Sequence, residues 1–534
     1  MRIAAIFSAL AMFGITLRAQ PSAPKPGSVQ GLVTSSVTGE PVKKAIVALE
    51  GAQSQNNKTA TSDAMGRFQF DSVAPGLYYL SAARDGFQAS NEKRTRVAVA
   101  EEQNVKDVVV KVVPLASVIG HVLGEDGDPI VRAQVRVLQY YYGSVRKWTN
   151  TVGASQANDL GEFDVVDLPP GRYYFQVMAP SPRTVPPHTR WTHPEEAYAV
   201  TYYPNVRELS QATATDVAAG AHLSNIDFHL GKMPAFHIRG TISGVVSGAG
   251  AEGRVQVAPL SGSRENIAGT ALQADGTFDL RGLVSGAYSL SYLRFGVRGQ
   301  SGIGQTISVS DSDVNGVNLI DKPTIAISGT VTVEGTQPNE LNIQISIAAE
   351  REMAAMGAPS ADGRFEIKDI PPQVYQVEVS NFRPGTYVKS IRFGDHEIPS
   401  GELDLTESTS APLNIVLAED GGEVDGNVQT ATSQPAVETQ VTLAPAEEYD
   451  GRSDLFKRVI TDASGNFQIK DVAPGEYKVF AWESDLEGST RSAEFRKPFE
   501  SKSAGVTVGP KDKASVQLTV ITADDMARER SKLP

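Results

Sequence analysis

The chain has 534 residues, with 49 Lys and Arg against 62 Asp and Glu, so its formal net charge is −13. This acidic balance argues against a nucleic-acid partner, because a phosphate-binding surface needs basic side chains. There is no cysteine, which excludes disulfides, Cys-ligated zinc or iron–sulfur centres and a thiol nucleophile. The length predicts several domains rather than one.

The N-terminal segment is predicted to direct export. Residues 1–19 have a short basic start at Arg2 and an apolar core over Ile3–Leu17, which indicates a cleavable signal peptide. The alternative is an N-terminal membrane anchor. Residues 20–26 are rich in proline and indicate an extended linker. We therefore expect an exported protein that is periplasmic, on the outer surface or extracellular, with no membrane span in the mature chain.

Internal repetition dominates the rest of the sequence. A short strand pattern with a central glycine, flanked by β-branched residues, occurs five times: at 29–33, 118–122, 238–242, 327–331 and 424–428. Each copy is followed by a segment in which apolar residues alternate with polar ones, which predicts a strand with one buried face.

A longer signature follows in every copy. In the first copy, Asp63 and Gly66 precede the alternating pair Phe68 and Phe70, and Pro75-Gly76 precede a tyrosine at position 78. The five signatures span 63–78, 159–173, 275–288, 362–375 and 462–477.

The residues of this signature predict specific turns. Asp and Gly favour a tight turn, because Asp bonds nearby backbone and Gly accepts positive φ. Pro75-Gly76 predicts a type II turn with the glycine in the left-handed position. At the equivalent place the fourth copy has Gln373, which predicts a type I or open turn instead. Tyr78 is expected to point inward with its hydroxyl reaching a backbone group, by analogy with a tyrosine corner.

Each copy ends in another alternating strand, at 108–112, 226–230, 317–319, 413–417 and 516–520. Short strands separated by turns about ten residues apart predict an all-β chain of five tandem Greek-key sandwiches. We define the five repeats, and expect five domains, as 27–114, 115–232, 233–322, 323–418 and 419–521, with a tail at 522–534. Their short linkers predict a semi-rigid rod. Brief helices are expected at Glu350–Met356 and after Thr522.

The whole pattern resembles the carboxypeptidase regulatory-like domain, and the likeness is strongest in repeats one, two and five. The resemblance implies a transthyretin-like (prealbumin-like) seven-stranded sandwich and a non-catalytic module, often described as carbohydrate-binding-like. It fixes no ligand, because one fold hosts many functions.

The sequence offers little support for catalysis. His193 and Glu196 have the H-x-x-E spacing of zinc carboxypeptidases, and His222 or His229 would be the third ligand. No large α/β catalytic segment accompanies them, so zinc carboxypeptidase activity is a distant alternative. The Asp311–Gly316 segment begins like a calcium loop but has Lys322 where the bidentate Glu belongs. We therefore predict no catalytic residue, metal or cofactor.

The second repeat carries an extra stretch rich in proline, histidine and aromatic residues. Inserted loops on a rigid scaffold often bind ligands, and aromatic rings with polar tips suit sugar faces. The hypothesised ligand-binding residues are Trp148, Trp191, Tyr198, Tyr202 and Tyr203. The alternative is that these rings form a satellite core or pack against the third repeat. For Trp482 in the fifth repeat, we expect it to cap the distal end of the rod or to close the last sandwich.

The leading hypothesis is thus a non-catalytic, exported protein that binds a glycan or cell-envelope polysaccharide and, as a further possibility, surface proteins. The alternative is a structural or protein-interaction spacer at the cell surface without a small ligand.

Overall fold

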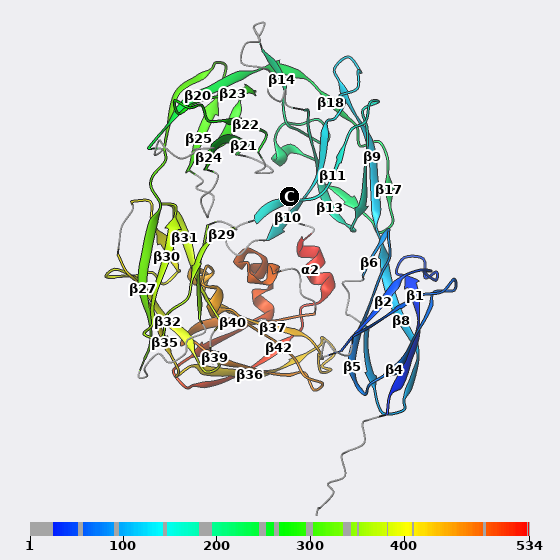
Figure 1. Cartoon of the computed structure of the whole chain (residues 1–534). Helices are drawn as coiled ribbons and strands as arrows, with labels where there is room; N and C mark the ends of the chain where they lie inside the picture. Colours follow the sequence, from blue (N-terminus) through cyan, green and yellow to red (C-terminus); the bar gives the residue numbers. More distant parts are fainter. Residues whose placement is uncertain are drawn as a thin grey trace, which may run out of the picture. The chain divides into compact units, whose positions relative to one another are not determined.

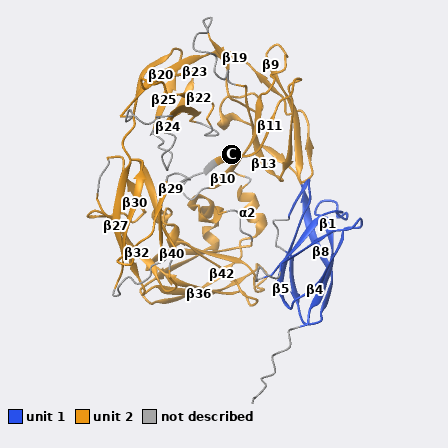
Figure 2. Ribbon diagram, viewed as in Figure 1, with its two compact units in different colours: residues 1–114 blue, residues 115–534 orange. Residues whose placement is uncertain are grey.

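The computed structural model describes residues 25–51, 57–89, 95–142, 147–180, 195–244, 253–260, 266–294, 303–334, 343–349, 352–381, 383–407, 411–483, 488–530 and 532. The predicted signal peptide lies outside these residues. The chain separates into two compact units, residues 1–114 and 115–534 (Figure 2). None of the helices among the described residues has the length and apolar character needed to span a bilayer.

Every repeat contains two facing sheets, many of whose strands are labelled in Figure 1, and the chain is all-β as predicted. In the first repeat the opening-strand sheet contains β4 (Arg67–Val73), β1 (Gly27–Ser35), β8 (Asn104–Pro114) and β6 (Phe87–Ala89), and the second sheet contains β3 (Lys58–Thr61), β2 (Ile46–Gly51), β5 (Gly76–Ala83) and β7 (Thr95–Val99).

The second repeat follows the same plan with an added pair of short antiparallel strands and a short 3₁₀ helix. Its opening-strand sheet contains β12 (Glu162–Leu168), β9 (Ala116–Gly124), β17 (His222–Leu223) and β18 (Phe228–Leu230), and its second sheet contains β11 (Lys147–Gln156), β10 (Gln134–Tyr142), β13 (Gly171–Met178), β15 (Thr201–Tyr202) and β16 (Thr215–Val217). The additions are β14 (Glu196–Tyr198), which pairs with β19 (Lys232–Pro234), and η2 (Leu209–Gln211).

The third and fourth repeats keep this order. The third contains β23 (Thr277–Leu283), β20 (Phe236–Ser243) and β26 (Val314–Ile320), then β22 (Ala268–Ala271), β21 (Gly253–Pro259), β24 (Gly286–Arg294) and β25 (Ile303–Val309). The fourth contains β30 (Arg364–Ile370), β27 (Ile325–Val333), β35 (Leu413–Ala418), β32 (Tyr387–Phe393) and β33 (His396–Glu397), then β29 (Glu352–Gly357), β28 (Gln344–Ala349), β31 (Val374–Ser380) and β34 (Glu402–Asp404).

The fifth repeat adds the helical segments. Its sheets contain β39 (Asn466–Val472), β36 (Gly422–Gln429) and β42 (Lys513–Thr519), then β38 (Lys457–Ile460), β37 (Gln440–Pro445), β40 (Gly475–Trp482) and β41 (Ala504–Val508). The helices are η3 (Glu447–Tyr449), η4 (Ser453–Leu455), η5 (Ser489–Arg491), α1 (Ala493–Arg496), η6 (Lys497–Lys502) and α2 (Ala523–Arg530).

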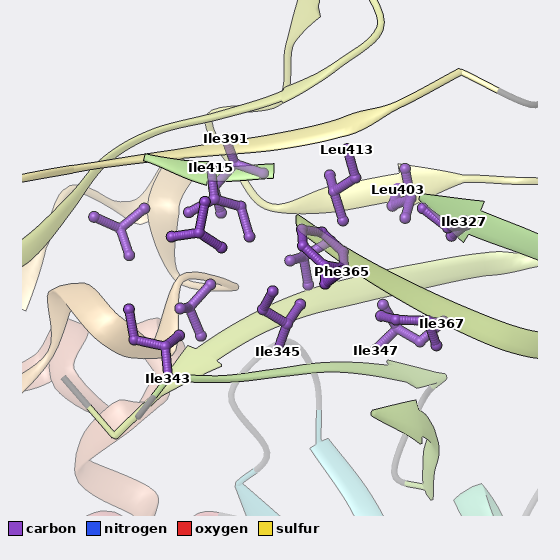
Figure 3. Packing of buried hydrophobic residues seen from close by; sticks show 14 of the residues in the cluster. Ile327, Ile343, Ile345, Ile347, Phe365, Ile367, Ile391, Leu403, Leu413 and Ile415 are labelled. Carbon is purple, nitrogen blue, oxygen red and sulfur yellow. The ribbon is translucent and has the colours of Figure 1, made fainter. Parts of the chain in front are cut away.

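Each repeat buries its own hydrophobic core between its two sheets. In the fourth repeat, Figure 3 shows Ile345 and Ile347 of β28 facing Phe365, Leu413 and Ile415 of the opposite sheet. The alternation in the sequence produces this arrangement, because every second side chain of a strand points to the same face.

The opening strand needs a glycine at its centre because the closing strand approaches it closely. The opening and closing strands run parallel, with Gly31 opposite Val108 in the first repeat and Gly426 opposite Val516 in the fifth. A Cβ at either glycine would lie within 3.0 Å of the carbonyl oxygen of that partner. The aromatic side chain of the neighbouring antiparallel strand, Phe68 or Phe467, also packs onto the space that a Cβ would occupy.

The signature tyrosine forms the predicted bond in all five repeats. The hydroxyl of Tyr78 donates to the carbonyl oxygen of Ala74 at 2.8 Å, and that of Tyr288 donates to Val284 O at 2.7 Å. The equivalent bonds in the other repeats join Tyr173 to Pro169 O, Tyr375 to Pro371 O and Tyr477 to Ala473 O. The prediction of a tyrosine-corner contact is confirmed.

These buried tyrosines predict a loss of stability at alkaline pH. Burial raises the pKa of Tyr288 to about 12, whereas an unfolded tyrosine has a pKa of about 10. Above pH 10 the unfolded ring releases its proton and the folded ring does not, so the free energy of unfolding falls as pH rises towards 12. Urea unfolding at pH 8, 10 and 11.5 measures this slope.

The variant Tyr288→Phe provides the control for this titration. It should lose about 1 kcal/mol at pH 8, because the bond to Val284 O is removed, and it should show a shallower alkaline decline than the natural chain. An equally steep decline in both chains would contradict the assignment.

The predicted type II turn at Pro75-Gly76 is wrong. Gly76 begins β5 without a positive φ, and the left-handed residue is Ser72, with φ 54°. The equivalent residues are Asp167, Gly282, Asp369 and Asp471. Each lies at a register shift between the opening strand and its antiparallel neighbour, so the left-handed residue belongs to a β-bulge inside the strand and not to the turn that follows it. Gln373 therefore occupies a position that needs no glycine.

Two other expectations meet different outcomes. Residues 352–357 form β29 rather than a helix, because they pair with β28, for example Ala355 with Ile347. The helix after Thr522 is confirmed as α2, where the amide of Asp525 donates to Thr522 Oγ1 at 3.2 Å.

The rod prediction is wrong within residues 115–534, because the second repeat packs against the fifth. Tyr142 of β10 lies in one buried cluster with Phe495 and Met526 of the helical segments, and the ring centroids of Tyr142 and Phe495 are 5.0 Å apart. Trp482 belongs to this cluster on the outer face of β40 and stacks on Phe480. It therefore neither caps a rod nor closes the core of the last sandwich.

Candidate functional site: the cleft between the second and third repeats

A wide cleft of 2310 Å³ lies between the second and third repeats. Its walls include the outer faces of the second sheets of both repeats. On β10, Val135 and Val137 are fully buried in the core, so the alternating Gln134 and Arg136 point outward and line the cleft. The third repeat contributes the corresponding outward residues of β21, Arg254 and Gln256, which alternate with buried valines.

A buried charge network joins the two repeats at one end of this cleft. His237 of β20 lies between two carboxylates, with Nδ1 2.6 Å from Asp279 Oδ1 and Nε2 3.0 Å from Glu195 Oε2. The side chains of His237 and Glu195 are 5% and 7% exposed. The backbone oxygen of Glu195 also accepts from the amide of Ala235 at 2.8 Å. The segment that leads into β14 is thereby fixed to the first strand of the third repeat.

Further charges complete the network. Asp313 accepts from the His237 amide at 3.0 Å and pairs with Arg239 at 2.7 Å. Partial desolvation opposes ionisation of Asp313, but these two hydrogen bonds outweigh it and hold its pKa below the usual value. Arg281 pairs with Asp279 at 2.8 Å. Both carboxylates that flank His237 also line the cleft. The network therefore joins the two repeats and contributes polar groups to the wall of the cleft.

The structure places the hypothesised ligand-binding aromatic residues in different environments. Tyr198 on β14 is half-buried and lines the cleft. Tyr202 reaches the lining but is only 1% exposed, and its hydroxyl accepts from Gln176 Nε2 at 2.9 Å. Tyr203 packs against the core edge, with its ring centroid 6.3 Å from that of Phe228. A ring as buried as Tyr202 offers no face to a ligand in this conformation.

The side chains of the two tryptophans lie outside the described part of the structure. Trp148 lies on β11 opposite Tyr141, but only its backbone is described. Trp191 lies outside the described residues. Of the five residues, Tyr198 is the one lining residue whose described side chain is not fully buried, and it also packs against the core of the second repeat.

The arginines and glutamines of the cleft were not predicted from the sequence. One signal was present: Gln-Val-Arg at 134–136 and Arg-Val-Gln at 254–256 place long polar side chains at corresponding strand positions of neighbouring repeats. Alternation identifies these side chains as outward-facing. It cannot show that the two outward faces line the same cleft.

The described residues considered for a zinc carboxypeptidase site lie on different strands and have different neighbours. Glu196 lies on β14, His222 Nδ1 contacts Ser117 Oγ at 2.8 Å, and His229 is exposed on β18. His193 lies outside the described residues. Among the residues that the structure describes, no group of three His, Asp or Glu side chains has an arrangement that could hold a metal ion.

The comparisons with family models identify two segments. Residues 28–111 match the carboxypeptidase regulatory-like domain, so the first repeat is a domain of this kind. Residues 458–516, in the fifth repeat, match domain II of polysaccharide lyase family 4. No curated protein matches the chain.

Several solved structures match parts of this chain. They include the Bacillus anthracis TIE protein (12% identity, 56% of this chain and 51% of that chain, TM-score 0.18) and the minor pilin GBS52 of Streptococcus agalactiae (14%, 39% and 97%, 0.24). A third is a Pseudomonas aeruginosa protein described as a candidate carbohydrate-binding protein (21%, 16% and 89%, 0.13). This chain spans about half of the TIE protein. At these TM-scores the matches carry no argument about function.

Proposed function

We propose that this chain is an exported, non-catalytic protein of five β-sandwich domains that binds polysaccharide in the cleft between its second and third repeats. The observation that carries the proposal is the chemistry of the cleft, which is wide, open and lined by arginine, glutamine and a half-buried tyrosine. The apolar N-terminal segment, which is typical of a signal peptide, supports export. The five domains are those defined by the repeat boundaries above.

The dimensions favour a polymer over a small molecule. Pockets for small ligands usually enclose about 300–1,000 Å³ and are mostly apolar, whereas this cleft measures 2310 Å³. Glutamine amides and arginine guanidinium groups can bond the many hydroxyls of a sugar chain. We expect the half-buried ring of Tyr198 to supply an apolar contact for a sugar.

The test is a polysaccharide panel with the full chain, read by affinity electrophoresis and isothermal titration calorimetry. The variant Gln256→Trp places a bulky ring in the cleft and should reduce binding at least tenfold. The control Gln69→Trp makes the same exchange on the exposed face of β4, outside the cleft, and should bind normally. Equal binding by both variants would contradict the site.

The same samples address the alternatives. Neither new reducing ends nor released C-terminal amino acids should appear after prolonged incubation with polysaccharides or peptides. If no polymer in the panel binds, the proposal is wrong and the structural spacer becomes the better account.

A further inference from the structure

The charges of the cleft are unevenly matched. Five arginines line it: Arg132, Arg136, Arg207, Arg254 and Arg281. Four carboxylates also line it: Glu195, Glu196, Glu208 and Asp279. This local balance differs from that of the whole chain, where carboxylates outnumber basic residues by 62 to 49.

Most of the carboxylates are already occupied. Glu195 contacts His237, and Asp279 contacts His237, Arg239 and Arg281. Glu208 also has interaction partners. Of the carboxylates that line the cleft, this leaves Glu196, which is exposed on β14.

Three of the arginines have exposed side chains without a carboxylate partner among the described residues. Arg254 donates to the carbonyl oxygen of Gly269 at 3.4 Å, and Arg207 lies 3.2 Å from Met233 Sδ. Arg132 is exposed in the turn before β10. A guanidinium with free donors matches the oxygens of a carboxylate or a sulfate, and it retains its charge at all working pH values.

These arginines come from both walls of the cleft. Arg132 and Arg207 belong to the second repeat and Arg254 to the third. A polymer in the cleft therefore meets positive charge from two sides, while the acidic remainder of the chain disfavours polyanions elsewhere.

We infer that the ligand of this cleft is an anionic polysaccharide, whose carboxylate or sulfate groups pair with Arg132, Arg207 and Arg254. The inference rests on the proposed function and adds the charge of the polymer to it. Because the arginines are exposed, the interaction is screened by salt, and binding should weaken as ionic strength rises.

The experiment uses the full chain and polymers paired by charge. Polygalacturonate is compared with its fully methyl-esterified form, which removes the charge and keeps the backbone, and dextran sulfate is compared with dextran. At least one anionic polymer should bind at least tenfold more tightly than its neutral counterpart. The first pair reports on carboxylates and the second on sulfate esters.

Matched variants locate the charge. The triple variant Arg132→Ala, Arg207→Ala, Arg254→Ala should lose about tenfold in affinity for the anionic polymer, as expected for a few exposed ion pairs, and little for any neutral polymer. Arg254→Lys should retain part of the affinity. The control Arg67→Ala, Lys106→Ala, Lys111→Ala removes the same charge from exposed positions of the first repeat and should bind as the natural chain does.

Each outcome decides between the two proposals. Equal binding of charged and neutral polymers would overturn the inference and leave the proposed function standing. Binding of duplex DNA as tight as that of the anionic polysaccharide would also overturn it, because charge alone would then explain the affinity. A failure of all four polymers to bind would contradict the inference, and only a failure of the whole polysaccharide panel would contradict the proposed function as well.

Discussion

Replacing Gly426 by alanine is expected to destabilise the fifth repeat by about 3 kcal/mol or more. The added Cβ would lie within 3.0 Å of the carbonyl oxygen of Val516 and 2.8 Å from the ring of Phe467. The carbonyl belongs to the parallel strand β42, whose ladder with β36 runs over seven residue pairs. The backbone therefore cannot withdraw without breaking that ladder. Urea unfolding followed by circular dichroism measures the loss.

Gly505→Ala is the matched control in the same repeat. Gly505 lies on β41, is exposed, and would have nothing within 4 Å of an added Cβ. Its replacement should be neutral or stabilise by a few tenths of a kcal/mol, because alanine restricts the unfolded chain. If Gly426→Ala were as harmless as Gly505→Ala, the close approach of the opening and closing strands would not explain the repeated glycine.

Phe495→Ala is expected to have the second large effect, a loss of about 3–5 kcal/mol. Phe495 is fully buried, and its ring lies 5.7 Å from that of Trp482 and 5.0 Å from that of Tyr142, measured between centroids. Its truncation leaves a cavity between the helical segment of the fifth repeat and β10 of the second. Urea unfolding gives the size of the effect.

The local consequence can be measured separately. Limited proteolysis should cut the helical segment at 489–502 faster in Phe495→Ala than in the natural chain, because the contact with Tyr142 is lost. Phe495→Leu keeps most of the volume and should cost less than about 1.5 kcal/mol. Equal proteolysis of all three chains would mean that this cluster does not hold the second and fifth repeats together.

Local features of the fold could be predicted because each depends on a few neighbouring residues. The opening glycine, the alternating core positions and the hydroxyl bond of Tyr78 all follow from short-range sterics and strand geometry. The turn at Gly76 was mispredicted because Pro-Gly favours a type II turn locally, whereas the left-handed residue is Ser72, in a bulge that depends on pairing with β1.

Features that depend on contacts between residues far apart in the sequence could not be predicted. Residues 352–357 have a helical composition, yet pairing with β28 makes them a strand. The contact between Tyr142 and Phe495 joins residues more than 350 positions apart, and no periodicity encodes it. Short linkers suggested a rod because they restrict neighbouring repeats without showing how they turn.

The candidate site, too, could be predicted only in part from the sequence. The inserted segment of the second repeat stood out in the sequence for its composition, and Tyr198 from it lines the cleft. Tyr202 was chosen for its ring, but it is buried beside Gln176, since a bulky ring on an alternating strand is more easily accommodated inside. Arg254 belongs to the next repeat, and only the three-dimensional arrangement brings it to the same cleft as Arg132.

The most direct test of this account is a hydrogen-exchange footprint of the full chain saturated with an oligosaccharide of the polymer that binds best. Protection is expected at residues 131–136 and around Arg207 in the second repeat, together with 254–256 in the third, because these segments form the two walls of the cleft. Protection confined to other repeats, or to only one of the two walls, would contradict the claim that the second and third repeats bind the ligand between them.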